Sequence, residues 1–359
     1  MATVTLDARS DVITGLTRRR FLGGVSLVAV LAAYGGESGP NPSTTGDAVE
    51  GSGFPVTVDH KYGSTTIPAR PQRVVTVGFT DPDFVLALGV EPVAITDWYG
   101  DYPLGIWPWA QDALGDAKPG VMPRPQGDKL NFELIAGFRP DLIIGQYTGM
   151  TQEEYERASR LAPTVAQSGE HQDYTAPWQV TTRTVGKALG RPAQAEQLIT
   201  GVESRFASVR REHPEFVGAP LIVTERLEVS TVYIRTEEPQ NGLFREPGFT
   251  QPEPIAELLV DEDGYSGNLS DERMELLDTA SVVVWKLFDQ ASVPEELANH
   301  PHISESEGSA GGARPVLTDK VLVGALAFGS VLSMPYALDR IVPMLAATLD
   351  GDPATVPVS

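Results

Sequence analysis

The chain contains no cysteine among its 359 residues and only five histidines. Without cysteine, a disulfide framework, thiol catalysis and cysteine-based zinc sites are all excluded. The histidines are scattered, and the flanking of Pro301 by His300 and His302 does not give the geometry of a helical zinc pair. We also find no P-loop, no serine-hydrolase elbow and no kinase motif set, so the sequence indicates no enzyme.

Basic residues are few. Lys and Arg number 27 against 48 Asp and Glu, and the formal net charge is −21. Such a chain is not expected to bind nucleic acid or an anionic lipid surface. An acidic surface favours solubility, and it also suits a basic docking partner; charge alone leaves both interpretations open.

Long hydrophobic runs are also missing. The apolar stretch 21–33 is shorter than the roughly 20 residues that a membrane-spanning helix needs, and it follows Arg18, Arg19 and Arg20. This pattern resembles a twin-arginine export signal, with a membrane-anchor helix as the alternative. Residues 31–35 resemble a bacterial lipobox in which Tyr34 replaces the cysteine, and a phenol cannot carry the lipid. We therefore expect a signal peptide at 1–34, a flexible tether at 35–53 and an exported protein without a lipid anchor.

Short apolar strands alternate with helical patterns along the first half of the chain. Expected strands are 74–77, 92–96, 141–144 and 164–166, and expected helices are 82–88, 131–136, 152–162 (capped by Thr151) and 178–189. After Pro214 the alternation restarts, with strands 219–225, 230–235 and 281–285 and helices 255–259, 271–277 and 334–349, the last capped by Ser333. This alternation predicts an α/β fold with a parallel sheet wrapped by helices.

Residues 193–213 predict one long amphipathic helix near the middle of the chain. Its apolar residues form one stripe at helical spacing: Ala195, Leu198, Ile199, Val202, Phe206 and Val209. It can be an ordinary surface helix or a connection between two lobes. With the second interpretation, the lobes are residues 54–190 and 215–350, and the connecting helix is 191–214.

Several stretches together resemble one family, the iron-siderophore and vitamin B12 substrate-binding proteins of ABC importers. They cover nearly all of residues 54–349 and include "DPDFVLALGVEPVAI" (81–95), "NFELIAGFRPDLII" (131–144), "NLSDERMELLDTASVVV" (268–284) and "VLSMPYALDRIVPML" (331–345). Residues 97–110 further resemble an actinobacterial iron-transport lipoprotein subgroup. The resemblance implies two Rossmann-like lobes joined by a single long helix, with the ligand cleft between them. It also implies a monomer that carries a ferric siderophore and has no intrinsic cofactor, resident metal or catalytic residue.

Candidate ligand contacts follow from one rule, because ligands of α/β sheets bind beyond the carboxyl ends of strands. Aromatic faces and fixed cations at those ends suit a bulky, often anionic iron chelate. The rule selects Trp98, Tyr99, Tyr147, Arg226 and Lys286. Three further aromatic residues complete the candidates: Trp107 in a loop interrupted by Pro108, Tyr233 in the expected strand 230–235, and Trp285 at the end of the expected strand 281–285. Alternatives stay open: core packing for Trp285, cross-strand packing for Tyr233, and ordinary surface charge for Arg226 and Lys286.

Two glutamates match positions that, in this family, pair with arginines of the membrane permease. They are Glu133 in "NFELIA" and Glu272 in "SDERMELL", each in the first turn of an expected helix. Negative charge there also stabilises a helix through its dipole, so both roles are compatible.

We therefore expect an exported receptor that captures a ferric siderophore for an ABC importer. Within binding proteins, the alternative is a haem or corrinoid receptor, with Tyr99, Tyr147 or His171 as the iron ligand. From other classes, the alternatives are an exported chelatase-like enzyme and an envelope-interaction protein without a transport role.

Overall fold

The computed structural model describes residues 53–123, 129–228, 231–235, 239–258, 266–287, 316–317 and 319–350. The expected signal peptide and nearly all of the expected tether lie outside the described residues, as do the side chains of Arg226, Tyr233 and Glu272. Among the described helices, none has both the length and the apolar character that crossing a membrane would require.

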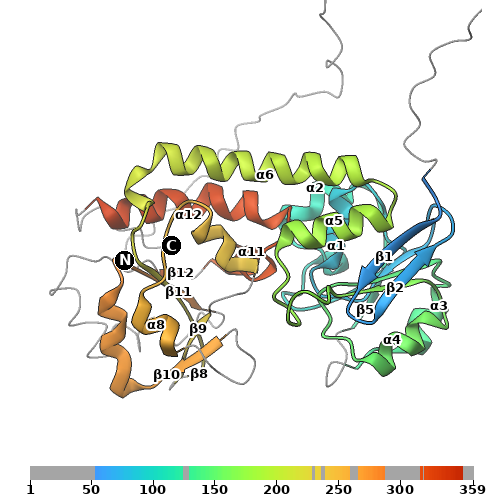
Figure 1. The fold of residues 1–359 in the computed structure, drawn as a ribbon, viewed down its shortest axis with the longest axis horizontal. Coiled ribbons are helices and arrows are strands. Elements are labelled where there is room, and N and C mark those ends of the chain that lie inside the picture. The colour runs from blue at the N-terminus through green and yellow to red at the C-terminus, as the bar shows by residue number, and fades with distance from the viewer. Residues whose placement is uncertain are drawn as a thin grey trace, which may run out of the picture. The chain divides into compact units, whose positions relative to one another are not determined.

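A parallel five-stranded sheet forms the first half of the fold (Figure 1). Its order is β5-β4-β3-β6-β7, and every neighbouring pair is parallel. All residues of β3, β4, β6 and β7 are buried, which explains why these strands are continuous apolar runs rather than alternating ones. The strands are β3 (Val74–Thr76), β4 (Ala94–Thr96), β5 (Gly120–Met122), β6 (Leu142–Gly145) and β7 (Thr164–Ala166).

The expected helices of this half begin within one residue of their predicted starts, and α1 begins at Asp81, with Thr80 as its N-cap. Asn131 accepts a hydrogen bond from the backbone N–H of Leu134 at the start of α3, and Thr151 forms a capping box with Glu154 at the start of α4. The elements are α1 (Asp81–Ala87), η1 (Pro103–Gly105), η2 (Pro108–Ala110), α2 (Gln111–Leu114), α3 (Phe132–Gly137), α4 (Gln152–Ser159) and α5 (Trp178–Ala188).

An antiparallel hairpin that the sequence analysis missed precedes the sheet. It consists of β1 (Val56–His60) and β2 (Gly63–Ile67), joined by a turn at Lys61 and Tyr62. The hairpin packs against α5 and β7, so its turn lies beside the loop that follows β7. Its strands bury only every second residue over most of their length, a weak pattern in so short a segment.

The expected long helix is present as α6 (Pro192–Glu212). Its buried residues, Ala195, Ile199, Val202 and Phe206, come from the predicted stripe. The helix packs against α5 at one end and against α12 (Ser333–Leu349) further along, and Figure 1 shows α6 running beside α12. A 3₁₀ turn, η4 (Pro214–Phe216), follows it.

The second sheet is mixed rather than wholly parallel. Its order is β10-β9-β8-β11-β12; β8, β11 and β12 are parallel, while β9 and β10 add antiparallel strands at one edge. Pairing with β9 extends β8 beyond its expected end at residue 225. The strands are β8 (Leu221–Glu228), β9 (Thr231–Arg235), β10 (Ser266–Leu269), β11 (Val282–Leu287) and β12 (Val316–Leu317).

Two details of the remaining helices differ from what the sequence predicts. The segment expected as a helix at 271–277 is a 3₁₀ helix, η5 (Asp271–Thr279). Ser333 is the first residue of α12 rather than its cap; its side chain accepts a hydrogen bond from the backbone N–H of Ser330, 2.9 Å away. The other elements are α7 (Pro239–Arg245), α8 (Glu253–Leu258) and α11 (Lys320–Phe328).

Candidate ligand-binding site

Aromatic side chains meet beyond the carboxyl ends of three neighbouring strands, as the strand-end rule predicts. Phe79 follows β3, Trp98 follows β4 and Tyr147 follows β6. The rings of Phe79 and Trp98 are stacked at 5.4 Å between centroids, and Trp98 lies 5.9 Å from Tyr147. The structure therefore brings Trp98 and Tyr147 together, and it adds Phe79, which the sequence analysis missed.

The loop after β4 supplies three more rings. Tyr99 lies edge-on to Trp98 at 4.7 Å and to Trp107 at 5.1 Å, and Trp107 stacks on Trp109 at 4.8 Å. Trp98 and Tyr99 are half-buried, whereas Trp107 is only 1% exposed. Trp107 therefore lies beneath the more exposed rings and packs against Tyr99 and Trp109.

Phe328, at the end of α11, completes this group from the second half of the fold. Its ring centroid lies 5.3 Å from that of Trp98, 5.6 Å from Trp107 and 5.0 Å from Trp109. We call these rings the aromatic cluster: Phe79, Trp98, Tyr99, Trp107, Trp109, Tyr147 and Phe328. The strand-end rule could not find Phe328, because it ends a helix; its signal was an aromatic residue before Gly329, which ends α11 in the left-handed conformation.

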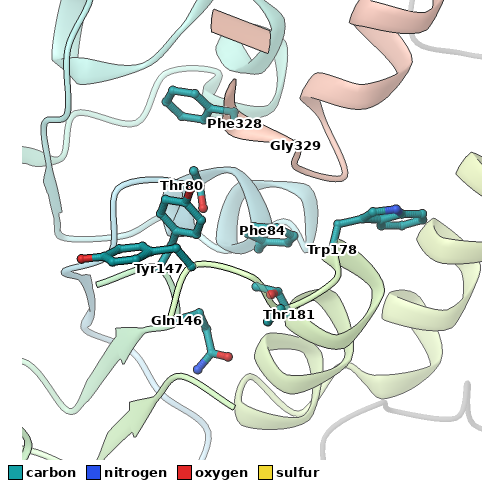
Figure 2. Close-up of a pocket in the computed structure, with 10 residues that line it drawn as sticks. Thr80, Phe84, Gln146, Tyr147, Trp178, Thr181, Phe328 and Gly329 are labelled. Atoms are coloured by element: carbon teal, nitrogen blue, oxygen red, sulfur yellow. The ribbon is translucent and has the colours of Figure 1, made fainter. Parts of the chain in front are cut away.

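A small pocket lies beside the aromatic cluster (Figure 2). Its cavity volume is about 10 Å³, roughly the room that one water molecule needs. Phe328 both lines this pocket and packs against Trp98 and Trp109 of the aromatic cluster. The pocket is lined by Thr80, Phe84, Gln146, Tyr147, Tyr174, Ala176, Trp178, Thr181, Phe328 and Gly329.

A buried carboxylate, Asp81, holds two of these strand-end loops together. It accepts hydrogen bonds from the backbone N–H groups of Gly78 (3.1 Å), Gln146 (2.9 Å) and Tyr147 (3.1 Å). Burial raises the pKa of Asp81 to about 6, although the three N–H donors lower it. Asp81 thereby fixes the backbone from which Tyr147 projects.

A second buried carboxylate, Asp83, links the two halves. It accepts hydrogen bonds from Nε1 of Trp109, 2.8 Å away, and from the hydroxyl of Ser330, between α11 and α12. Burial raises the pKa of Asp83 to about 6, while these two donors act in the opposite direction. The contact anchors the loop of the aromatic cluster to the helix pair that carries Phe328.

Lys286 lies within β11 rather than beyond its end, because this strand continues to Leu287, and Trp285 lies on the same strand as expected. Trp285 packs with Ile222, Met274 and Leu277 in an apolar cluster of the second half, which fits the core-packing alternative. Lys286 points to the opposite face of the strand, since neighbouring residues alternate, and is 1% exposed. The two side chains therefore do not share one surface of the sheet.

Arg226 and Tyr233 are described by their backbones alone. Arg226 lies within β8, where it is paired with Leu287 of β11 and Val232 of β9, so the expectation that it follows the strand is wrong. Tyr233 lies in β9, opposite Glu225 and Asn268.

Glu133 is exposed in the first turn of α3, next to Leu134, which is 40% exposed. Glu272 lies near the start of η5. Within the described ranges, no group of three or more acidic or histidine side chains is arranged to hold a metal ion.

The chain belongs to the periplasmic binding protein family, whose model matches residues 82–310. The fold agrees with this class. A solved periplasmic solute binding protein from Mycobacterium smegmatis is 34% identical, with a TM-score of 0.72, over 82% of this chain and 98% of that one. PiaA of Streptococcus pneumoniae, solved in complex with ferrichrome, is 25% identical, with a TM-score of 0.70, over 82% and 99% of the two chains.

Among curated relatives, the probable siderophore-binding lipoprotein YfiY of Bacillus subtilis is 27% identical over 249 residues. The match covers 68% of this chain and 73% of YfiY. The expected family resemblance and the α/β fold are thereby confirmed.

Proposed function

We propose that this protein captures a ferric siderophore outside the membrane and delivers it to the permease of an ABC importer. The observation that carries the proposal is the aromatic cluster, which joins strand-end loops of one sheet to α11 of the other half. Flat apolar faces of this kind suit the bulky organic shell of an iron chelate. The names of YfiY and of the PiaA complex, which refer to siderophore and ferrichrome binding, support the same conclusion.

In this proposal, Trp98, Tyr99, Tyr147 and Phe328 contact the chelate, and Trp107 supports them. Arg226 and Lys286 supply positive charge to an anionic chelate after the halves move apart. Tyr233 stays a candidate contact on the edge strand β9, whereas Trp285 packs in the core of the second half and is not proposed as a ligand contact. The lobes are residues 54–190 and 215–350, connected by 191–214, and the protein acts as a monomer.

The remaining parts of the proposal concern chemistry and location. The protein binds and releases its ligand unchanged, performs no catalysis and does not bind nucleic acid. It is exported through its twin-arginine signal to the cell envelope, or released, and it carries no lipid anchor because Tyr34 cannot accept one.

Tryptophan fluorescence tests the proposal directly, because Trp98, Trp107 and Trp109 belong to the aromatic cluster. The purified chain is titrated with ferrichrome, a catecholate, a mycobactin-type siderophore, ferric citrate and haemin. We expect saturable quenching by one class of ferric siderophore at submicromolar concentration. Quenching by haemin alone, with a Soret band, would assign the protein to haem uptake through Tyr99 or Tyr147, and quenching by none of them would refute the transport proposal.

We propose that docking to the permease of the importer depends on Glu133 and Glu272. In cells that need the importer for iron, the double variant Glu133→Ala/Glu272→Ala is expected to abolish most uptake while the purified protein still binds the chelate. Glu153→Ala is the matched control, since Glu153 is also an exposed glutamate in the first turn of a helix. Equal uptake by the double variant and the control would show that the glutamates serve only their helices.

A further inference from the structure

Tyr174, which lines the pocket, stands in an unusual backbone conformation. Its φ angle is 69°, in the left-handed region that residues other than glycine seldom adopt. Its hydroxyl donates a hydrogen bond to the carbonyl of Thr148 (2.8 Å), and its ring lies edge-on to Tyr147 at 4.9 Å. A strained residue that lines a candidate site persists only when its surroundings hold it in place.

The adjoining chain leaves little freedom for this ring. A Cβ atom added at Gly149 would lie 2.4 Å from the hydroxyl oxygen of Tyr174, so the ring is seated directly on the glycine backbone. Tyr174 and the loop of Tyr147 therefore form one wall of the pocket, and any shift of residues 172–175 moves that wall.

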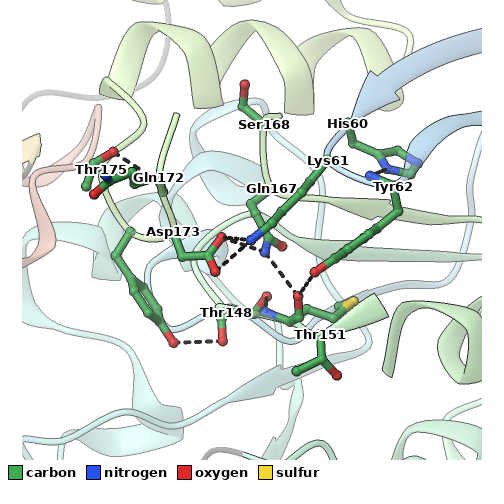
Figure 3. A network of polar contacts seen from close by, with 12 residues as sticks. His60, Lys61, Tyr62, Thr148, Thr151, Gln167, Ser168, Gln172, Asp173 and Thr175 are labelled. Carbon is green, nitrogen blue, oxygen red and sulfur yellow. Dashed lines mark hydrogen bonds and ion pairs between the residues drawn. The ribbon is translucent and has the colours of Figure 1, made fainter. Parts of the chain in front are cut away.

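The residue before Tyr174 is held by the turn of the hairpin (Figure 3). Nζ of Lys61 donates to both carboxylate oxygens of Asp173, at 2.7 and 2.8 Å, and Nε2 of Gln167 donates to the same carboxylate at 2.9 Å. The backbone N–H of Lys61 also donates to the carbonyl of Gln167 (2.9 Å). Lys61 in the turn therefore binds the loop that follows β7 through both a backbone and a side-chain hydrogen bond.

The same network reaches the loop that follows β6. The carbonyl of Met150 accepts hydrogen bonds from Nε2 of Gln167 (3.1 Å) and from the hydroxyl of Tyr62, the neighbour of Lys61 in the turn. Gln167 is 2% exposed and Met150 is 1% exposed, so this part of the network is shielded from water. The hairpin turn consequently contacts both loops that form the tyrosine wall of the pocket.

We propose that Lys61 is a positioning residue for the ligand site: through Asp173, it fixes Tyr174 and so sets the shape of the pocket wall. This inference rests on the proposed function for its effect on binding. The Lys61–Asp173 pair is partly exposed, with 37% and 32% of the two side chains accessible. Such a pair contributes little to global stability, so its main effect is on the local geometry of the loop.

The test compares Lys61→Met and Asp173→Asn with Lys61→Arg, which keeps the charge, and with Glu196→Gln. The last variant is the matched control, because it breaks another bidentate surface pair, Arg183–Glu196, with N–O distances of 2.8 and 3.1 Å. We expect faster hydrogen exchange in residues 168–177 of Lys61→Met and Asp173→Asn. Exchange in Lys61→Arg and Glu196→Gln should match the wild type. Raising NaCl to 1 M should speed exchange there in the wild type, Lys61→Arg and Glu196→Gln, which keep the ion pair, but not in Lys61→Met or Asp173→Asn, since salt screens the pair.

Ligand binding supplies the second readout, by tryptophan quenching with ferrichrome and the other ferric siderophores of the panel. The dissociation constant of Lys61→Met should rise about threefold to tenfold, the factor that follows from losing one hydrogen-bonding contact. Unchanged exchange in residues 168–177 would overturn the positioning role, and faster exchange with an unchanged dissociation constant would overturn its link to the ligand. If the wild type binds no chelate, the proposed function fails, and the exchange experiment alone still decides whether Lys61 positions Tyr174.

Discussion

The indole ring of Trp107 packs directly against the backbone of Gly324 in α11. A Cβ atom added at Gly324 would lie 2.2 Å from Cζ3 of the ring, and one added at Gly100 would lie 2.6 Å from its Cζ2. The ring is therefore held between a glycine of its own loop and a glycine of the second half. This packing, together with the hydrogen bonds that Trp109 and Ser330 donate to Asp83, connects the two halves independently of α6.

Gly324→Ala is expected to destabilise the protein. The ring is buried and has glycine backbone on both sides, so the new methyl group cannot be accommodated by a simple rotation. Overpacking of this kind costs about 1–3 kcal/mol, measurable as a lower free energy of unfolding in urea. Gly201→Ala is the control: Gly201 lies in α6 with nothing within 4 Å of an added Cβ, and alanine should stabilise it by about 0.5–1 kcal/mol.

A smaller residue at position 107 tests whether contact with the indole ring causes this loss of stability. Trp107→Leu should itself cost stability, because a large buried ring is lost, but the added cost of Gly324→Ala should then shrink. Equal costs of Gly324→Ala in the two backgrounds would show that the glycine serves some other purpose than seating the ring.

Asp81→Asn should destabilise the protein more than a carboxylate-to-amide change normally does. One oxygen of Asp81 accepts from Gly78 and Gln146, and the other accepts from Tyr147. In either orientation the new NH₂ group faces a backbone N–H, which leaves a buried donor unpaired at a cost of about 1–3 kcal/mol. Urea unfolding measures the loss, with Asp116→Asn at an exposed position as the control; similar values for both variants would contradict the role of Asp81.

Asp83 predicts a dependence of stability on pH. Its pKa is about 6 in the folded protein against an ordinary value of 3.8, so the folded state binds the proton first. The stabilisation from this proton is complete below pH 4 and is lost as the pH rises through 6. Between pH 5 and 7.5 the free energy of unfolding should therefore fall by about 1 kcal/mol through this group.

The variant Asp83→Asn isolates that contribution. The amide keeps an oxygen that can accept from Trp109 and Ser330, but it does not titrate. The difference in unfolding free energy between wild type and variant should grow in favour of the wild type as the pH falls from 7.5 to 5. A difference that stays constant over this range would mean that Asp83 does not titrate there.

The sequence predicted those elements whose pattern is strong over their whole length. The buried strands and the 21-residue helix α6 are of this kind, and the strand-end rule then located Trp98 and Tyr147 in one site. The strand-end rule failed where pairing with another strand determines where a strand ends. Pairing with β9 extends β8, so that Arg226 lies inside a strand.

Phe328 and Tyr174 were missed for a similar reason. Phe328 reads as one more apolar residue of α11, and its place in the aromatic cluster depends on how that helix meets the loop of Trp107. Tyr174 lies in a loop without periodicity, and its position depends on Lys61, which is 112 residues away from Asp173 along the chain. Contacts between segments so far apart leave no pattern in a single sequence.

The packing of Phe328 leads to a prediction about ligand entry. Its ring contacts Trp98, Trp107 and Trp109 and lines a pocket with room for about one water molecule, so we expect a chelate that binds at this pocket to displace it. If the closed arrangement dominates without ligand, part of the binding free energy is spent on opening it. Removing the ring should lower that cost and also expose Trp98 and Trp109 to water.

Phe328→Ala is therefore expected to shift tryptophan emission to longer wavelength, to increase quenching by iodide and to raise the association rate constant of the ferric siderophore. Stability should fall by about 3 kcal/mol, the usual range for loss of a buried phenylalanine. Phe216→Ala is the control, since Phe216 is also buried but stacks on Phe249, outside the aromatic cluster. A slower association in Phe328→Ala than in the wild type would mean that the ring does not obstruct entry, and that its proposed contact with the chelate already assists capture.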